Sequence, residues 1–182
     1  MRLLASKGCF IVKHKNAYGS QCRNNDETGI GYYLTHEFKT DVVRITFETP
    51  EATDFTRMLS TLFALIEAMA KELDIERNDI KGCLHKTKLQ NGWMVINLII
   101  YDAVAGGAGH TRRLVTSTGD VLSRVIHRAA KTMDACNCEP SCYKCLRNYY
   151  NQKIHDELNR FSARDFLLNF TGEIEPYEVL AD

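Results

Sequence analysis

Four cysteines lie within ten residues in the C-terminal half of the chain, with the spacing C-x-C-x3-C-x2-C: Cys136, Cys138, Cys142 and Cys145. Four thiolates can converge on one tetrahedral ion at about 2.3 Å if the backbone turns sharply between them. The intervening Glu-Pro-Ser at 139–141 is typical of such a turn. Four sulfur ligands leave no position for a reacting water, and zinc prefers this arrangement in structural sites. The spacing therefore predicts a structural zinc site, with an iron–sulfur cluster, a redox pair and uncoordinated thiols as the alternatives.

The other three of the seven cysteines are scattered along the chain. An odd number of cysteines without a secretion signal argues against a disulfide framework, because a reducing cytosol keeps thiols reduced. Cys9 and Cys22 could share a second metal site, although isolated cysteines are more often buried side chains, and Cys83 is interpreted as a small apolar residue in a strand. Beside the cluster, Lys144 and Arg147 would offset the net −2 charge of a zinc tetrathiolate.

A glycine-rich turn between an expected strand and an expected helix is the second candidate functional segment. It contains Asp102, Gly106, Gly107, Gly109 and His110, and it is followed by Arg112 and Arg113. Glycines permit a positive φ, and free N–H groups at a helix start attract anions. The segment matches neither G-x-G-x-x-G nor the P-loop, so nucleotide binding is not indicated. A tight packed turn is one interpretation, and contact of the two arginines with a phosphate backbone is the other.

Residue types suited to acid–base or nuclease chemistry are present at Asp102, His110 and His155, but no spacing ties them together. The structural alternative is that His110 hydrogen-bonds within the glycine turn and that His155 begins the last helix.

Three tyrosines near the cysteine cluster, Tyr143, Tyr149 and Tyr150, alternate with Lys144 and Arg147. Such alternation is found in surfaces that stack on bases. Packing of the rings around the metal knuckle is the alternative.

The elements that position these residues follow from hydrophobic periodicity. A strand is expected between residues 37 and 48, and Thr49-Pro50-Glu51 indicates a helix start, with Thr49 as the cap, for a helix that runs to about Asp74. Further strands are expected at 80–85 and 93–101 around an Asn91-Gly92 turn, and helices after the glycine turn to Met133 and from about 158 to Gly172. The fold class is α+β, with a small mixed β-sheet packed on helices and a helical C-terminal half that carries the four-cysteine knuckle.

Length and composition predict one globular domain. The 182 residues carry 45% hydrophobic and 25% charged side chains, which excludes disordered, collagen-like and coiled-coil classes. We divide it into an N-terminal β and loop segment (1–30), an α+β core (31–134), and a knuckle with a C-terminal helix (135–172).

The net charge is 0, but the charges are unevenly distributed. Two stretches with five excess bases (1–24, 110–164) alternate with two stretches with five excess acids (25–109, 165–182). No apolar run of about 18 residues and no signal peptide is found, so a cytoplasmic protein without membrane contact is expected.

Several segments together resemble a known domain: Thr35–Asp41, Leu73–Ile80, Tyr101–His110, Cys136–Tyr149, His155 and Leu158–Arg160. From about residue 30 to residue 170 the chain is similar to the zinc-binding C-terminal domain of superfamily-2 helicases, a family that includes the mitomycin-repair helicases and the helicase-associated component of DISARM-type anti-phage defence. The resemblance implies a non-catalytic module beside a DNA-translocating motor, with zinc held by the four cysteines. This sequence contains no P-loop and no Walker-B context, so ATP hydrolysis by that route is not expected. The helicase partner is therefore expected in cis, if the chain is an excised domain, or in trans.

Three functions are compatible with these observations. The leading hypothesis is a zinc-binding, helicase-associated accessory module of DNA repair or anti-phage defence, which contacts DNA or docks on the motor. For DNA the candidate residues are Arg112, Arg113, Lys144 and Arg147. The alternatives are a metal-dependent nuclease that uses Asp102, His110 or His155, and a protein-interaction adaptor.

Overall fold

The computed structural model describes residues 2–10, 29–35, 38–115 and 120–170, and the chain divides into two compact units, 1–38 and 39–182. In the first unit, strands β1 (Arg2–Phe10) and β2 (Gly29–Thr35) pair antiparallel, with an irregularity between Ala5 and Cys9. Of the proposed second metal site, Cys9 is described only as part of the β1 backbone, and Cys22 lies outside the described residues.

The second unit contains a three-stranded sheet of order β3-β5-β4, formed by β3 (Val42–Ile45), β4 (Ile80–Lys88) and β5 (Met94–Asp102). Every pair is antiparallel, which corrects the predicted mixed sheet. The turn at Asn91-Gly92, where Gly92 has φ +90°, is too short for the crossover that parallel strands need, so β4 and β5 pair antiparallel. The central strand is the one with the nearly continuous apolar sequence, and its Val95, Leu98 and Ile100 are buried.

Helix α1 (Phe55–Leu73) is the long predicted helix, but it begins later than expected. Thr49 and Pro50 introduce a separate 3-10 helix, η1 (Pro50–Thr53), and the Thr49 side chain makes no cap hydrogen bond. The cap is Asp54, whose carboxylate accepts the backbone N–H of Arg57 at 2.8 Å. A carboxylate at this position satisfies a helix N–H and complements the positive end of the helix, so it replaces the predicted hydroxyl.

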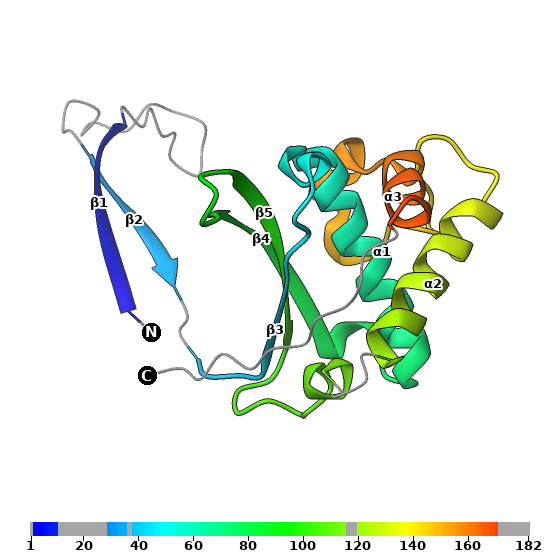
Figure 1. Ribbon diagram of the computed structural model, residues 1–182. Helices are drawn as coiled ribbons and strands as arrows, with labels where there is room; N and C mark the ends of the chain where they lie inside the picture. Colours follow the sequence, from blue (N-terminus) through cyan, green and yellow to red (C-terminus); the bar gives the residue numbers. More distant parts are fainter. Residues whose placement is uncertain (1, 11–28, 36–37, 116–119, 171–182) are drawn as a thin grey trace, which may run out of the picture. The chain divides into compact units, whose positions relative to one another are not determined.

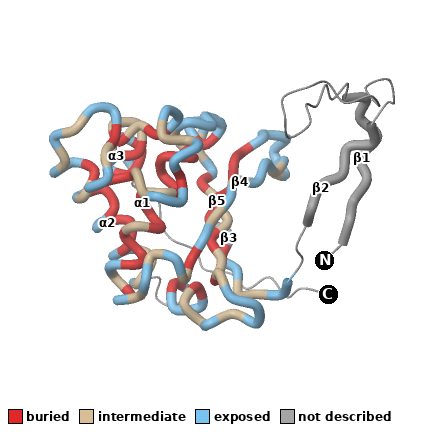
Figure 2. The backbone as a smooth tube through the Cα atoms, turned by 180° about the vertical axis from the view of Figure 1, so that it is seen from behind, coloured by how far each residue is buried: buried red, intermediate tan, exposed pale blue. Residues whose placement is uncertain are grey.

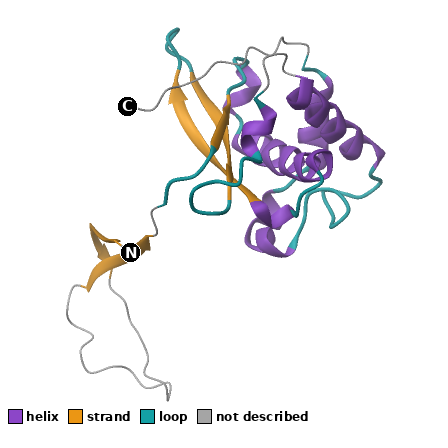
Figure 3. Cartoon of the chain, turned by 90° about the horizontal axis from the view of Figure 1, so that it is seen from below, coloured by secondary structure: helices purple, strands orange, loops and turns teal. Residues whose placement is uncertain are grey.

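One face of the sheet lies against α1, and α2 (Asp120–Ala135) and α3 (Arg160–Leu168) pack on the other sides of this helix (Figure 1; Figure 3). Figure 2 shows the buried backbone running through these elements. Gly82 on β4 marks the closest approach, because a Cβ there would lie 2.8 Å from Leu62 Cδ1 and 2.9 Å from Ile66 Cδ1 of α1. The core of the second unit is therefore the interface between the sheet and α1, continued between the helices.

The C-terminal part of this unit is helical, as predicted, and the α+β class is confirmed. The glycine turn leads into the 3-10 helix η3 (Thr111–Leu114), and the cysteine segment leads into η4 (Tyr149–Glu157). The last helix begins at Arg160 behind the cap Asn159, so His155 does not start it but lies within η4. The predicted interruption near Gly119 and the end at Gly172 lie outside the described residues. In the described part, none of the helices has the length and apolar character needed to cross a membrane.

Candidate metal centre

The four clustered cysteine sulfurs converge on one point between the end of α2 and the start of η4. All four Sγ atoms lie within 4.8 Å of one another, with individual separations of 3.4 Å (Cys136–Cys138), 3.6 Å (Cys136–Cys142), 3.5 Å (Cys138–Cys145) and 3.9 Å (Cys142–Cys145). A tetrahedron of sulfurs at about 2.3 Å from zinc has edges of about 3.8 Å, whereas a disulfide joins its sulfurs at about 2.05 Å. The spacing therefore fits a shared metal ion and not a disulfide pair.

Backbone amides and burial shape the chemistry of these thiols. The N–H of Cys142 donates to Cys145 Sγ at 3.2 Å, and the N–H of Lys144 donates to Cys142 Sγ at 3.4 Å. Burial raises the pKa of Cys138 and of Cys145. Burial also acts to raise the pKa of Cys142, but the Lys144 N–H and the neighbouring sulfurs lower it to about 7. Hydrogen bonds to sulfur stabilise thiolate, which is the form that binds metal.

Arg160 at the start of α3 ties the cysteine segment to α2, and sequence reasoning gave it no role. Its side chain is buried (7% exposed), and the guanidinium donates to the carbonyls of Cys138 at 2.6 Å and Met133 at 3.0 Å. Its backbone N–H donates to the carbonyl of Pro140 at 2.8 Å. One residue of α3 therefore holds both the turn between the cysteines and the last turn of α2, and it brings a positive charge to the cysteine segment.

A second set of hydrogen bonds fixes the chain after the fourth cysteine. The Asn148 side chain caps η4, and the Asn151 Nδ2 donates to the carbonyl of Leu146 at 2.8 Å. The His155 Nε2 lies 2.8 Å from Asn151 Oδ1 and 3.1 Å from the carbonyl of Asn148. This places His155 in a structural network around the knuckle.

The backbone N–H groups of the glycine turn form hydrogen bonds within the turn itself. The buried carboxylate of Asp102 accepts the backbone N–H groups of Ala108 (2.7 Å), His110 (3.0 Å) and Thr111 (2.9 Å). Burial acts to raise the pKa of Asp102, but the bonds from Thr111, Ala108 and His110 outweigh it and lower the pKa. The amides that were candidates for binding an external anion are therefore already bound to Asp102, which supports the interpretation of this segment as a packed turn.

The arginines after the turn differ in their contacts. Arg112 forms an ion pair with Asp41, with an Nη2–Oδ1 distance of 2.7 Å, and Arg113 is exposed. Gly107 has φ +74°, and a Cβ there would overlap the carboxylate of Asp41. The turn is thus closed against the start of β3, and only a glycine fits at position 107.

The comparisons with known proteins bear on the cysteine cluster directly. Residues 61–146 match the family model described as the MrfA Zn-binding domain. The match begins within α1 and ends directly after Cys145. The convergent cysteines provide the donor set and the spacing that zinc requires, so the predicted cofactor and the predicted resemblance are confirmed.

Two known proteins are similar to this chain over more residues than the family model matches. The Druantia protein DruE of Escherichia coli (strain UMEA 4076-1) is 27% identical over 143 residues, which cover 70% of this chain and 8% of DruE. The crystal structure of the helicase MrfA bound to DNA aligns with 79% of this chain and 19% of that chain, at 17% identity and a TM-score of 0.52. At this identity the second likeness shows the fold. The chain spans less than a fifth of the length of either relative.

The residues proposed for nuclease chemistry are not assembled around the cysteine cluster or elsewhere in the described ranges. Asp102 and His110 belong to the glycine turn, whereas His155 bonds within η4. Among the described residues, the four cysteines are the one group of three or more His, Cys, Asp or Glu side chains arranged to hold a metal. The nuclease alternative therefore gains no support from the geometry.

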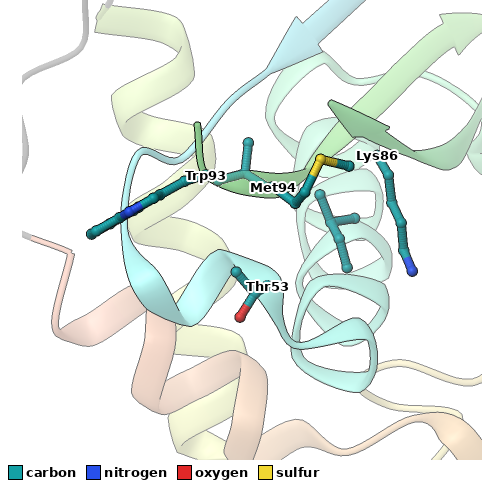
Figure 4. Close-up of a pocket in the computed structure, with 6 residues that line it drawn as sticks. Thr53, Lys86, Trp93 and Met94 are labelled. Carbon is teal, nitrogen blue, oxygen red and sulfur yellow. The ribbon is translucent and has the colours of Figure 1, made fainter. Parts of the chain in front are cut away.

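A shallow pocket of about 380 Å³ lies between η1 and the tip of the β4–β5 hairpin, close to Trp93 and Met94 (Figure 4). Its polar side chains are Thr53 and Lys86, and the remaining lining is apolar. An enzyme pocket combines enclosure with several convergent polar groups. This pocket lacks that combination.

Proposed function

We propose that this chain is an accessory module of a DNA helicase, in which zinc fixes the C-terminal helices and the module contacts DNA or docks on the motor. The observation that carries the proposal is the convergence of four cysteine sulfurs within 4.8 Å in a segment that matches the MrfA Zn-binding domain. In this proposal Cys136, Cys138, Cys142 and Cys145 are the zinc ligands. The zinc acts structurally, because four sulfur ligands leave no open coordination position.

DNA repair or anti-phage defence is the proposed setting, and the cytoplasm is the proposed location. The support is that the relatives are a helicase crystallised with DNA and a protein of the Druantia system. Because the chain covers only a small share of each, the motor is proposed to lie elsewhere in the same polypeptide or in a separate one. We retain Arg113, Lys144 and Arg147 as candidate DNA contacts, whereas Arg112 would first have to leave Asp41.

The test combines metal analysis with binding assays on the full chain. We expect one zinc per chain after purification under reducing conditions, and loss of that zinc in a Cys142→Ser variant. Gel-shift assays in a salt series, on single-stranded and duplex DNA, would be run with the chain alone and with a candidate helicase. Absence of DNA binding in both settings would remove the DNA part, and failure to co-purify with any helicase would remove the docking part.

A further inference from the structure

Three tyrosines beside the metal centre stand open to solvent. Tyr143, Tyr149 and Tyr150 are 65%, 74% and 71% exposed. Most of the surface of each tyrosine is therefore in contact with solvent and is not packed around the knuckle, as the alternative had it. Scattered exposed apolar residues need no explanation, but three large exposed aromatic rings within eight residues of the sequence are expected to have a partner; these three tyrosines are called the patch below.

The three rings are held in place before any partner arrives. The rings of Tyr149 and Tyr150 meet edge to face, with centroids 5.5 Å apart, and Tyr143 meets His155 in the same way at 5.5 Å. The Tyr150 hydroxyl accepts a hydrogen bond from Asn78 Nδ2 at 3.0 Å. Because such side chains lose little freedom on binding, the patch is preorganised.

The backbone that carries these rings is the knuckle itself. The N–H groups of Cys145, Leu146 and Arg147 all donate to the carbonyl of Cys142, at 3.0–3.1 Å. Directly after this turn, Asn148 Oδ1 accepts the N–H of Tyr150 at 2.9 Å. The backbone of the cysteine segment therefore leads directly into the turn that carries Tyr149 and Tyr150, so a zinc held by the four cysteines would also fix these two side chains.

The charge of the segment favours a polyanion. Residues 141–155 contain Lys144, Arg147 and Lys153 and no aspartate or glutamate. Lys144 and Lys153 are exposed, and Arg147 donates to Ser141 Oγ at 2.9 Å. Carboxylates border the segment at Glu139, Asp156 and Glu157, and the neighbouring Glu67 of α1 is paired with Arg77 at 2.6 Å. Cations thus alternate with the exposed rings inside this segment, whereas Glu76 and Asp79 flank the Asn78 that bonds Tyr150.

We propose that Tyr143, Tyr149 and Tyr150 form a stacking surface for the bases of single-stranded DNA, with Lys144 and Lys153 contacting its phosphates. Exposed aromatic rings interleaved with cations bind single strands, because unpaired bases offer open π-faces that a duplex keeps stacked. The proposal deepens the proposed function and rests on it, since it names the DNA form and the contact residues of the helicase-associated module.

The experiment uses the full, zinc-loaded chain and fluorescence anisotropy with labelled dT20, a 20-base-pair duplex and rU20. We expect dT20 to bind more tightly than the duplex. The double variant Tyr149→Ala/Tyr150→Ala is expected to weaken dT20 binding by at least about tenfold, whereas Tyr149→Phe/Tyr150→Phe should stay within about threefold, because stacking survives without the hydroxyl. Lys144→Gln and Lys153→Gln should each lower the slope of log K against log salt by about 0.7.

The control is Trp93→Ala, which removes an aromatic ring that is 50% exposed on the β4–β5 hairpin, away from the knuckle. It should leave dT20 binding unchanged, and all variants should keep one zinc and the wild-type melting temperature.

If the wild type binds dT20 and the double alanine variant binds equally well, the stacking surface is wrong while the proposed function stands. If the wild type binds no DNA but still co-purifies with a helicase, the stacking surface and the DNA part both fail. A tenfold preference for rU20 over dT20 would overturn the assignment to DNA, and tyrosine-dependent helicase binding without DNA binding would make the patch a protein contact.

Discussion

Replacing Arg160 by methionine tests whether α3 holds the metal centre in place. The guanidinium is the buried group that links the carbonyls of Cys138 and Met133. Methionine fills a similar volume but donates no hydrogen bond, so the carbonyl of Met133 loses a buried donor and that of Cys138 a partly buried one. We expect the variant to fold, to melt at a lower temperature and to release zinc more readily.

The magnitude follows from the two lost bonds. Each buried carbonyl left without a donor costs about 1–3 kcal/mol, and removal of the buried cation returns part of this by ending its desolvation. A net loss of about 3 kcal/mol in the free energy of unfolding is expected, which corresponds to a decrease in Tm of about 6–12 °C for a chain of this length. Because Arg160 orients the turn between the ligands, zinc affinity should fall by about 10–100-fold.

The assay is urea unfolding of the zinc-loaded protein, combined with zinc transfer to a colorimetric chelator. Arg164→Met is the matched control, because Arg164 lies one turn later on α3, pairs with the exposed Asp165 at 2.6 Å and, like Arg160, lies over the ring of Phe161. This pair is expected to contribute less than about 1 kcal/mol. Equal stability and equal zinc transfer of the Arg160→Met and Arg164→Met variants would refute the reasoning.

Four further outcomes are expected. Asp102→Asn removes the negative charge and replaces one of the two accepting oxygens by an NH2 donor, which faces backbone N–H groups, so it should lower the unfolding free energy by about 2–4 kcal/mol, measured by urea unfolding at pH 7. Because the pKa of Asp102 is lowered on folding, its stabilisation is fully present above the unfolded value of about 3.9 and is lost as pH falls through the folded pKa, so the stability difference between wild type and Asp102→Asn should shrink only below about pH 4. A difference that shrinks between pH 7 and pH 5 would contradict this. Gly107→Ala should destabilise by at least about 1 kcal/mol, because its Cβ meets Asp41, and Gly92→Ala, which has a similar φ but open space around it, is the control for the backbone strain alone. Chelation of zinc should lower the Tm of the wild type and leave that of Cys142→Ser unchanged.

The sequence predicted the parts of the structure that depend on local pattern. The apolar stripe of α1, the β-branched run of β5 and the cysteine spacing each point to one arrangement, and the structure contains it. The predicted start of α1 is wrong because Thr49-Pro50 introduces a separate 3-10 helix, and α1 itself begins at Phe55. The Asp54 carboxylate, three residues before the Arg57 N–H that it accepts, was the signal that could have corrected it.

The local sequence pattern could not predict contacts between residues that are far apart in the chain. Arg160 looks like any surface arginine in the sequence, and only the packing of α3 on α2 places it under the cysteine turn. Likewise, nothing local to Asp102 distinguishes a catalytic carboxylate from one that organises a turn, because the N–H groups it binds come from residues six to nine positions later. The capping residues Asn148 and Asn159, by contrast, follow the known preference for Asn before a helix and could have been found.

The limits of the matched segment do not coincide with the limits of the folded core. A recombinant fragment restricted to residues 61–146 would start six residues inside α1 and would omit both β3 and α3. It would leave one edge of β5 unpaired, expose the apolar surface that Phe166 and Leu167 cover, and lack the arginine that holds the cysteine turn. Expression of this region for metal or binding studies therefore calls for boundaries at or before residue 39 and at or beyond residue 170.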